Sequence, residues 1–259
     1  LEHLSPEDVV IALREIHRVC KKNIYFIIAI TQDRENHYNL TVENRAWWEQ
    51  RFYEAGFRKH PSYYEANNYE SLQNDPWQIK IVLEKISVEV LERYPLEVLI
   101  EERDLHTDMT REVGERSDAH IHRYFEAAKY IRYGDTVLDA ACGLGYGSSL
   151  LYHNSLASKV MGIDGSKYGI DYATMNFGLE QSVVFQEGYL PDALHVIPDS
   201  SIDFIVSFET LEHVDKPMEL LAEFYRILTP GGRIFISVPN DWSDETGEDP
   251  NPFHLHVYN

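Results

Sequence analysis

The sequence has few cysteines, few basic residues and no long apolar run. Its only cysteines, Cys20 and Cys142, give no disulfide framework, which indicates a reducing compartment, so a cytoplasmic location is expected. No apolar run approaches the roughly 20 residues of a membrane-spanning helix, and no secretory leader pattern is seen. The 23 Lys and Arg residues are outnumbered by 43 Asp and Glu residues, for a formal net charge of −20. That balance excludes a general nucleic-acid binder, which needs a clustered basic face.

The sequence does contain enough apolar and aromatic residues for a core. Hydrophobic residues make up 44% and aromatic residues 12% of the 259 positions, a length that suits one large or two small domains. Two stretches are nearly alike, "LEHLSPEDVV" at residues 1–10 and "LEHVDKPMEL" at residues 211–220. Behind each come an amphipathic helix pattern and an apolar run, "NIYFIIAI" in the first case and "RIFISVP" in the second. The same order of elements behind both copies indicates an internal repeat.

The pattern of elements divides the chain into three regions. Residues 1–85 hold the first copy, a helix pattern "VENRAWWEQRFYEAGF" and strand patterns around "FRKHPSYYE" and "WQIKIVLEKI". Residues 86–115 are crowded with charges and predict a linker with some helix. Over residues 116–259 helices and apolar strands alternate, which predicts a parallel sheet flanked by helices.

A glycine-rich turn opens the third region. In "GDTVLDAACGLGYGSSLL" a short apolar strand is followed by Gly143, Gly145 and Gly147 and then by a helix pattern. Glycines there let the backbone turn sharply and approach a ligand, and a helix N-terminus offers unpaired N–H groups. The next strand, "KVMGID", ends in Asp164, where a nucleotide-binding fold places an acid against ribose hydroxyls. These elements in this order predict a nucleotide-type cofactor site.

Four segments of the third region are similar to one known family. The segments "VLDAACGLGYGS", "GIDGS", "SIDFIVSFETLEHV" and "RILTPGGRIFISVPN" resemble the core of class I S-adenosylmethionine-dependent methyltransferases, over residues 117–259. The resemblance implies an α/β fold with a Rossmann-like, doubly wound, mostly parallel sheet, and residues 1–85 would then be a partial second copy. A nicotinamide-dependent oxidoreductase shares the glycine-rich turn and the acid, but "SFETLEHV" and the "TPGG" turn favour the methyltransferase.

The resemblance also implies which residues hold S-adenosylmethionine. Asp139 and the loop residues would contact the methionine part, Asp164 the ribose, and the segment "FQEGYLPD" the adenine. The cofactor-binding residues expected on this basis are Asp139, Ala141, Gly143, Gly145, Asp164, Gly188, Tyr189 and Phe208. Two positions depart from the family pattern: Ala141 replaces the first loop glycine, and Tyr189 replaces the acid that often follows Gly188. Adenine recognition is therefore assigned to Tyr189 stacking, to Asp192 or to backbone groups.

The segment Glu209–His213 follows an apolar strand, so it lies at the edge of the sheet where ligands bind. Two carboxylates and an imidazole within five residues can bind Mg, Mn or Zn. The E-x-x-E-H arrangement resembles that of metal-assisted O-methyltransferases, in which a downstream histidine completes the ligand set. His254 matches better than His256 because of its spacing to Tyr258, so the expected metal ligands are Glu209, Glu212, His213 and His254. Without a metal, Glu209 or His213 is the candidate general base.

The function expected from these residues is methyl transfer from S-adenosylmethionine to an oxygen of a small-molecule or glycan-type acceptor, with a nitrogen or carbon atom as the less favoured acceptor. A rival from another class is a non-catalytic methyltransferase-like binding module. The repeat is explained either by a fragment of a longer tandem methyltransferase or by a permuted domain. We favour the fragment, because one sheet needs the duplicated piece only once.

Overall fold

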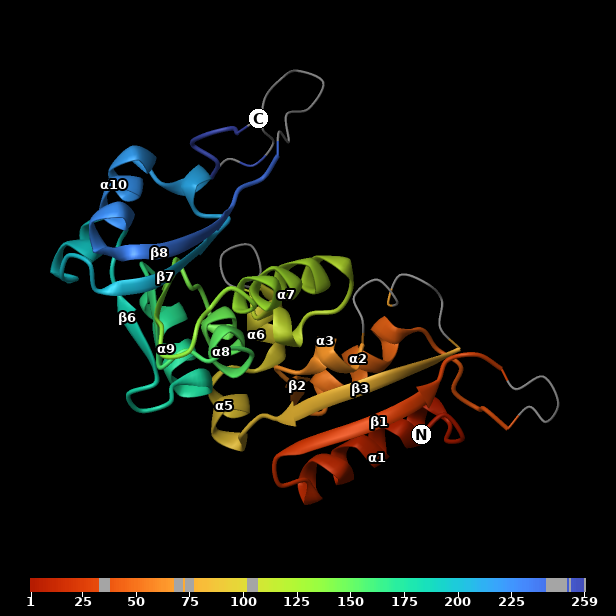
Figure 1. The fold of residues 1–259 in the computed structure, drawn as a ribbon. Coiled ribbons are helices and arrows are strands. Elements are labelled where there is room, and N and C mark those ends of the chain that lie inside the picture. The colour runs from red at the N-terminus through yellow and green to blue at the C-terminus, as the bar shows by residue number, and fades with distance from the viewer. Residues whose placement is uncertain are drawn as a thin grey trace. The chain divides into compact units, whose positions relative to one another are not determined.

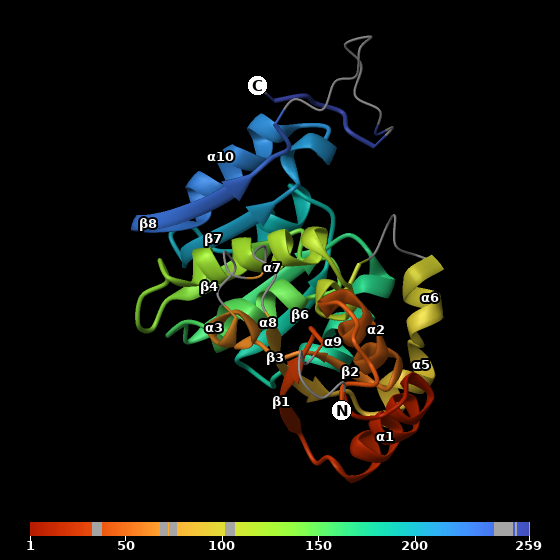
Figure 2. The same cartoon turned by 90° about the vertical axis from the view of Figure 1, so that its right-hand side faces the viewer.

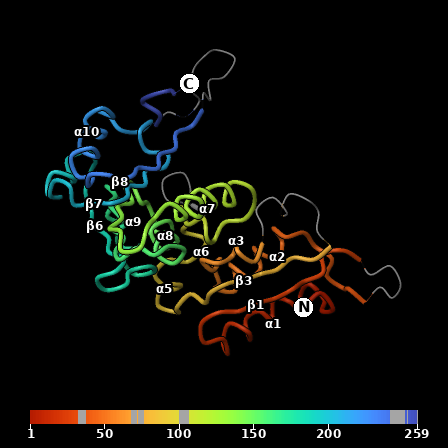
Figure 3. Tube along the Cα trace, in the orientation of Figure 1, coloured from red at the N-terminus to blue at the C-terminus, as the bar shows by residue number. Residues whose placement is uncertain are grey.

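The computed structural model describes residues 1–32, 38–67, 72, 77–101, 107–240, 251 and 253–258. The chain forms two compact units, Leu1–Phe125 and Glu126–Asn259, and Figure 3 follows the trace through both. Residues 86–115, expected as a linker, include helices α5 (Val88–Arg93) and α6 (Leu96–Glu101) and the 3-10 turn η1 (Met109–Arg111), and they belong to the first unit. Helix α7 (Glu115–Ala128) follows them. Within the described ranges, no helix is long and apolar enough to cross a membrane.

The first unit contains a three-stranded antiparallel sheet in the order β1-β3-β2 (Figure 1). Helix α1 (Pro6–Val19) leads into β1 (Asn23–Ala29), α2 (Arg45–Glu54) leads into β2 (Phe57–Lys59), and α3 (Tyr63–Ala66) precedes β3 (Gln78–Lys85). The strand expected around "FRKHPSYYE" is shorter than predicted, since its second half forms α3. Pro61 and Ser62 interrupt the extended backbone there, and the Tyr63 N–H donates back to the His60 carbonyl in a turn.

Local sequence explains the helices of this unit. Ser5 caps α1 by accepting a hydrogen bond from the Asp8 N–H, and Pro6 occupies the first turn, where its missing N–H costs nothing. The apolar face of α1 buries Val9 and Leu13. Figure 1 shows α1 running alongside β1. The unit's core therefore forms between α1, α2 and one face of the sheet.

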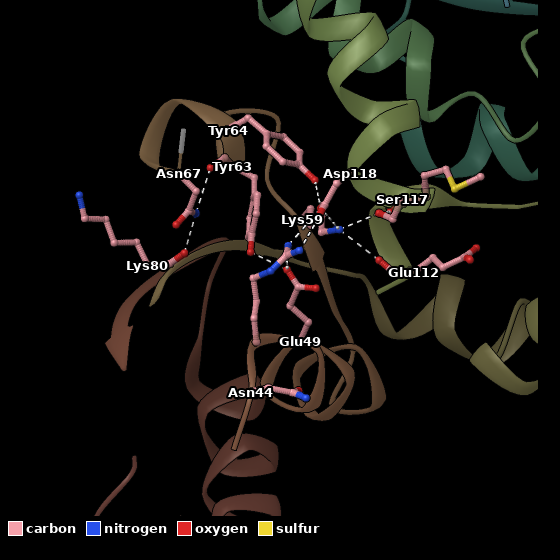
Figure 4. Close-up of polar contacts among 12 residues, drawn as sticks. Asn44, Glu49, Lys59, Tyr63, Tyr64, Asn67, Lys80, Glu112, Ser117 and Asp118 are labelled. Carbon is pink, nitrogen blue, oxygen red and sulfur yellow. Dashed lines mark hydrogen bonds and ion pairs between the residues drawn. The ribbon is translucent and has the colours of Figure 1, made fainter. Parts of the chain in front are cut away.

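A buried network of charges holds α2, β2, α3 and the start of α7 together (Figure 4). The Asp118 carboxylate accepts hydrogen bonds from Arg45 and from the Tyr64 hydroxyl, and the Lys59 ammonium lies 3.6 Å from it. Arg45 also donates to Glu49, which is fully buried. Burial lowers the pKa of Lys59; burial would raise the pKa of Asp118, but its hydrogen bond to Arg45 and the charge of Lys59 lower it overall. Two acids, Glu49 and Asp118, thus face two bases, Arg45 and Lys59, in a largely buried site.

The second unit is a five-stranded parallel sheet in the order β6-β5-β4-β7-β8. Along the chain it contains β4 (Thr136–Ala140), α8 (Tyr146–His153), β5 (Lys159–Asp164), α9 (Lys167–Phe177), β6 (Val183–Glu187), η2 (Asp192–Val196), β7 (Ile202–Phe208), η3 (Leu211–His213), α10 (Pro217–Ile227) and β8 (Leu228–Ser237). The parallel sheet expected for this region is confirmed. The strand order reverses direction at β4, next to β7, and ligands of open α/β sheets bind at the carboxyl ends of strands at such a switch point.

Apolar residues on both faces of the central strands form the core of this unit. Leu138, Ile163 and Ile205 are completely buried, and α10 adds Leu220 and Phe224 to the same cluster. Figures 1 and 2 show α10 lying along β8 from two directions. The expected turn at "TPGG" lies within β8. There the register moves from Ile202 opposite Leu228 to Phe204 opposite Arg233, so residues 229–232 bulge away from a single residue of β7.

Candidate cofactor and cation site

The glycine-rich turn connects β4 to α8 at the carboxyl edge of the second sheet. The N–H groups of Ala141 and Cys142 both donate to the Ile163 carbonyl, at 2.8 and 3.0 Å, which fastens the turn to β5. Gly145 caps α8 in the left-handed region with φ +79°. A Cβ on Gly145 would lie 2.5 Å from the Ala173 Cβ and 2.8 Å from the Phe185 ring. This glycine is therefore required for close packing of the turn on α9 and β6, whereas a Cβ on Gly143 would meet open space.

Ala141 and Asp139 occupy the start of the turn. Ala141 has φ +65°, a left-handed conformation that a side chain disfavours, at the position where the family pattern has glycine. The Asp139 carboxylate is completely buried and accepts a hydrogen bond of 2.7 Å from the Ser148 hydroxyl of α8. Asp139 thus links the end of β4 to α8 and stabilises the turn between them. Its expected contact with the methionine part of a cofactor stays a prediction.

Asp164 ends β5 with its carboxylate held at both oxygens. Oδ2 accepts a hydrogen bond of 2.9 Å from the Gly143 N–H, and Oδ1 accepts one of 2.8 Å from the Ser166 N–H. Each carboxylate oxygen can accept a second hydrogen bond, so the side chain is oriented and can still receive hydroxyl donors. Asp164 lines a pocket of about 240 Å³, whose lining also includes Ala141, Gly165, Tyr189, Glu209 and His213.

Tyr189 forms the wall of this pocket beyond β6. Its ring packs over Gly165, where an added Cβ would lie 2.7 Å from the ring, and 76% of its surface is exposed. Gly188 donates to the Asp164 carbonyl, and a Cβ there would collide with Ala193. Asp192 begins η2 and is not among the described residues that line the pocket. Of the two side chains expected near adenine, the structure brings only Tyr189 to the pocket.

The end of β7 turns sharply beside the pocket. Glu209 has φ +48°, its N–H donates to the Ser237 carbonyl, and its Oε1 accepts a hydrogen bond of 2.7 Å from the Ser237 hydroxyl. A left-handed glutamate is strained, and it persists only where surrounding contacts enforce it. Phe208, one residue earlier, packs edge-on against Phe235 with ring centroids 5.8 Å apart and is buried. Phe208 therefore belongs to the core, and it is not among the described residues lining the pocket.

Glu212, His213 and His254 form a cluster on the next turn. One ligand atom from each lies within 4.8 Å of the others. Glu212 is 1% exposed, and neither carboxylate oxygen has a hydrogen-bond donor within the described part of the chain. Burial raises the pKa of Glu212, and the charge of Glu209 raises it further. A buried carboxylate without a donor is costly unless a cation or proton compensates it.

The imidazole of His213 is oriented toward this carboxylate. Its Nδ1 lies 2.8 Å from the Phe253 carbonyl oxygen, which can only accept, so Nδ1 carries the proton. The other nitrogen, Nε2, lies 3.8 Å from Glu212 Oε1. A backbone carbonyl that fixes the tautomer of a histidine in this way is typical of metal ligands.

The structure distinguishes among the expected metal ligands. It brings His254 to the cluster, with its ring centroid 4.9 Å from that of His213, whereas the His256 ring bonds to the Val214 carbonyl. Glu209 is not part of the cluster, because its turn directs the carboxylate to Ser237. The donor set of one carboxylate and two imidazoles suits zinc or manganese. Sequence reasoning missed Ser237, Ser148 and Ser166, whose roles depend on the turns that carry them.

Comparisons with known proteins find methyltransferases that are similar to part of this chain. A family model described as "Methyltransferase domain" matches residues 138–236. A probable S-adenosylmethionine-dependent methyltransferase of Mycolicibacterium smegmatis is 32% identical over 128 residues, covering 49% of this chain and 47% of that protein. A mitochondrial ubiquinone biosynthesis O-methyltransferase of Dictyostelium discoideum is 32% identical over 116 residues, covering 41% and 36%.

Solved structures include similar chains as well. A SAM-dependent methyltransferase from Archaeoglobus fulgidus aligns over 62% of this chain and 67% of its own, with 22% identity and a TM-score of 0.47. The chain spans less than half the length of the curated relatives named above. Over residues 138–236 the chain is thus similar to methyltransferase domains, and the Mycolicibacterium smegmatis relative is named as a probable S-adenosylmethionine-dependent methyltransferase.

Proposed function

We propose that this chain transfers a methyl group from S-adenosylmethionine to an oxygen atom of a small-molecule or glycan-type acceptor at the pocket of the second unit. The observation that carries the proposal is the Asp164 carboxylate, held by the Gly143 and Ser166 N–H groups inside a pocket at the switch point of the sheet. A carboxylate fixed there is suited to accept the two hydroxyls of a ribose. The exposed Tyr189 ring offers a flat surface on which a base can stack.

The residues around the pocket fit the rest of the reaction. S-adenosylmethionine supplies a methyl group already activated on a sulfonium, so the protein must chiefly align the acceptor and exclude water. Glu209, positioned by Ser237 on the pocket wall, would take the proton of the acceptor hydroxyl as its oxygen bonds to the methyl carbon. The electron pair of the broken carbon–sulfur bond stays on sulfur, so charge and atoms balance.

A divalent cation fits the neighbouring cluster. Glu212, His213 and His254 would hold it, and the buried Glu212 carboxylate without a donor is the observation that favours it. When bound, such a cation supplies a Lewis acid that lowers the pKa of a hydroxyl. The alternative is metal-free catalysis with Glu209 or His213 as the general base. A measurement of cation binding distinguishes this mechanism from the cation-assisted one.

Relatives support oxygen as the acceptor atom. The ubiquinone biosynthesis enzymes of Dictyostelium discoideum and Candida albicans and the malonyl-[acyl-carrier protein] enzyme of Yersinia pestis are named O-methyltransferases. Phosphoethanolamine N-methyltransferase 3 of Arabidopsis thaliana, 34% identical over 105 residues, is named for nitrogen. The Glu209 carboxylate and the cluster of Glu212, His213 and His254 favour oxygen as the acceptor atom, because a hydroxyl needs deprotonation or polarisation before it attacks.

Calorimetry tests the cofactor assignment. We expect wild type to bind S-adenosylmethionine and not NAD, and Asp164→Ala to lose binding at least tenfold. Asp171→Ala is the matched control, since the half-exposed Asp171 of α9 pairs only with Lys167 among the described side chains. Binding of NAD without S-adenosylmethionine would refute the assignment and support an oxidoreductase.

Two further measurements test catalysis and the cation. Glu209→Gln should lower the rate of methyl transfer to a phenolic acceptor while leaving the cofactor affinity within about threefold. Cofactor binding with no transfer to any of a panel of phenols and glycans would favour the binding module. Equilibrium dialysis with manganese should show uptake that Glu212→Gln abolishes and that His195→Ala, an exposed histidine on η2, leaves unchanged. Equal, negligible uptake by all three proteins would rule out the cation.

A further inference from the structure

The cation cluster of the second unit is built on a pair of backbone hydrogen bonds, here called the second clamp. The N–H groups of Leu255 and His256 both donate to the Glu212 carbonyl, at 2.7 and 3.2 Å. The Nδ1 atom of His213 meets the carbonyl of Phe253, two residues before the first of these donors. The segment 253–256 is thereby fastened to η3 and presents His254 between its fastening points.

The first unit contains the same pattern, here called the first clamp. The N–H groups of Leu40 and Thr41 both donate to the Glu2 carbonyl, at 2.8 and 3.0 Å. The Nδ1 atom of His3 lies 3.1 Å from the carbonyl of Tyr38, again two residues before the first donor. Both clamps join a Leu-Glu-His segment, which precedes a helix and an edge strand, to a loop that returns after that strand.

The two clamps therefore align residue by residue. The pairs, first clamp before second, are Glu2 with Glu212, His3 with His213, Tyr38 with Phe253, Leu40 with Leu255 and Thr41 with His256. The alignment places Asn39 where the second clamp has His254. In all five pairs the same backbone or ring atoms form the same hydrogen bonds. The equivalence of Asn39 and His254, the sixth pair, therefore follows from this geometry and not from sequence identity.

We propose that the first clamp is a copy of the candidate cation site in which Asn39 has replaced the third ligand, so that the cation is bound by the second unit alone. The inference rests on the cation site of the proposed function. Among the described residues, no third His, Cys, Asp or Glu joins Glu2 and His3 in a ligand cluster. The Asn39 amide donates to the Thr31 carbonyl, which turns its nitrogen to the backbone.

The two carboxylates differ in the same sense. Glu2 Oε1 accepts a hydrogen bond of 3.4 Å from the Ala29 N–H at the end of β1. Glu212 has no such donor within the described ranges. The first carboxylate thus has a backbone donor, whereas the second has none within the described ranges and is left for a cation. An imidazole at residue 39 would restore the missing nitrogen ligand, since an amide is a poor ligand for zinc.

Zinc stoichiometry of the full chain tests the proposal by gain of function. We expect one zinc per chain in wild type, none in His254→Asn, two in Asn39→His, and one in the double variant, now held by the first unit. Asn39→Gln is the matched control and should keep one. One zinc in both wild type and Asn39→His would overturn the proposal.

The ring tautomers give a readout that does not depend on metal. In long-range nitrogen–proton NMR spectra of the metal-free chain, His3 and His213 should both carry the proton on Nδ1. A His3 ring protonated on Nε2 would overturn the copied clamp even if the second unit binds zinc. No zinc in any variant, with both rings protonated on Nδ1, would refute the cation site of the proposed function while supporting the copied clamp.

Discussion

Gly145 lets one methyl group test how the cofactor turn is packed. In Gly145→Ala the new Cβ would meet the Ala173 Cβ at 2.5 Å and the Phe185 ring at 2.8 Å, and neither is the end of a flexible side chain. The backbone there has φ +79°, which costs a non-glycine residue about 1–2 kcal/mol. Overpacking a filled site adds about 1–3 kcal/mol. The free energy of unfolding of the second unit should fall by about 2–5 kcal/mol.

Gly143→Ala is the matched control for this prediction. Gly143 also has a positive φ, +54°, but a Cβ there would meet nothing within 4 Å. It should therefore show only the conformational cost of about 1–2 kcal/mol. Amide hydrogen exchange of Leu138 and Ile163, in the strands beside the turn, measures the local free energy of opening.

The comparison of the two variants can refute the reasoning. If both lose the same stability within about 0.5 kcal/mol, close packing against α9 and β6 is not what requires glycine at residue 145. The cofactor affinity gives a second reading. Gly145→Ala should weaken S-adenosylmethionine binding at least tenfold, since displacing the turn moves the Gly143 N–H that orients Asp164. Unchanged affinity would show that the turn tolerates the shift.

Three further predictions concern the stability of the two units. Asp118→Asn leaves the partly buried Arg45 and the buried Lys59 with one fewer acid, and it should destabilise the first unit by about 3–5 kcal/mol in hydrogen exchange. Ala141→Gly relieves φ +65° and should stabilise the second unit by up to about 1 kcal/mol, measured in the same way. Burial, with Arg123 and Arg116 nearby, lowers the pKa of His120 from 6.5 to about 4. Since the folded state then binds fewer protons than the unfolded state, the free energy of unfolding should fall as pH drops from about 6.5 to about 4, and His120→Gln should flatten that fall.

The first two of these predictions have controls within the chain. Asp171→Asn removes an exposed partner of Lys167 and should cost under about 1 kcal/mol. Ala140→Gly lies in the buried strand β4 with no positive φ, so it should destabilise where Ala141→Gly stabilises. If Asp118→Asn and Asp171→Asn lower the free energy of unfolding by the same amount, burial does not determine how much the charge network stabilises the unit.

The glycine-rich turn could be predicted from the sequence because its determinants are local. Glycines, a buried strand before them and an acid at the end of the next strand are all visible as residue types at fixed spacing, and the structure places Gly143 and Asp164 in direct contact. The parallel sheet followed from the alternation of elements in the same way. Phe208 ends β7 and packs against Phe235, a contact that the sequence did not indicate, and its expected contact with the cofactor stays a prediction.

The cation cluster shows where spacing stops being informative. The pattern E-x-x-E-H offers two glutamates, and only the backbone decides between them. The left-handed turn at Glu209 bonds its carboxylate to Ser237, while Glu212 comes beside His213 on η3. A left-handed glutamate has no indicator in the sequence, since such conformations are imposed by surrounding contacts. The structure was therefore needed to tell which of Glu209 and Glu212 lies in the cation cluster and which lies on the pocket wall.

The proposed copy of the clamp, in contrast, rests on hydrogen bonds in the structure more than on residue identities. Of the returning loops, residues 38–41 and 253–256 share only the leucine at Leu40 and Leu255. Both loops are nonetheless fastened by two N–H groups on one carbonyl and by a ring nitrogen on another. On the returning loops those bonds use only main-chain N–H and carbonyl groups, which every residue except proline provides, so substitutions in the loops can accumulate without loosening the clamp. The side chain between the fastening points is then the one that can change function at little structural cost, and it is there that Asn39 and His254 differ.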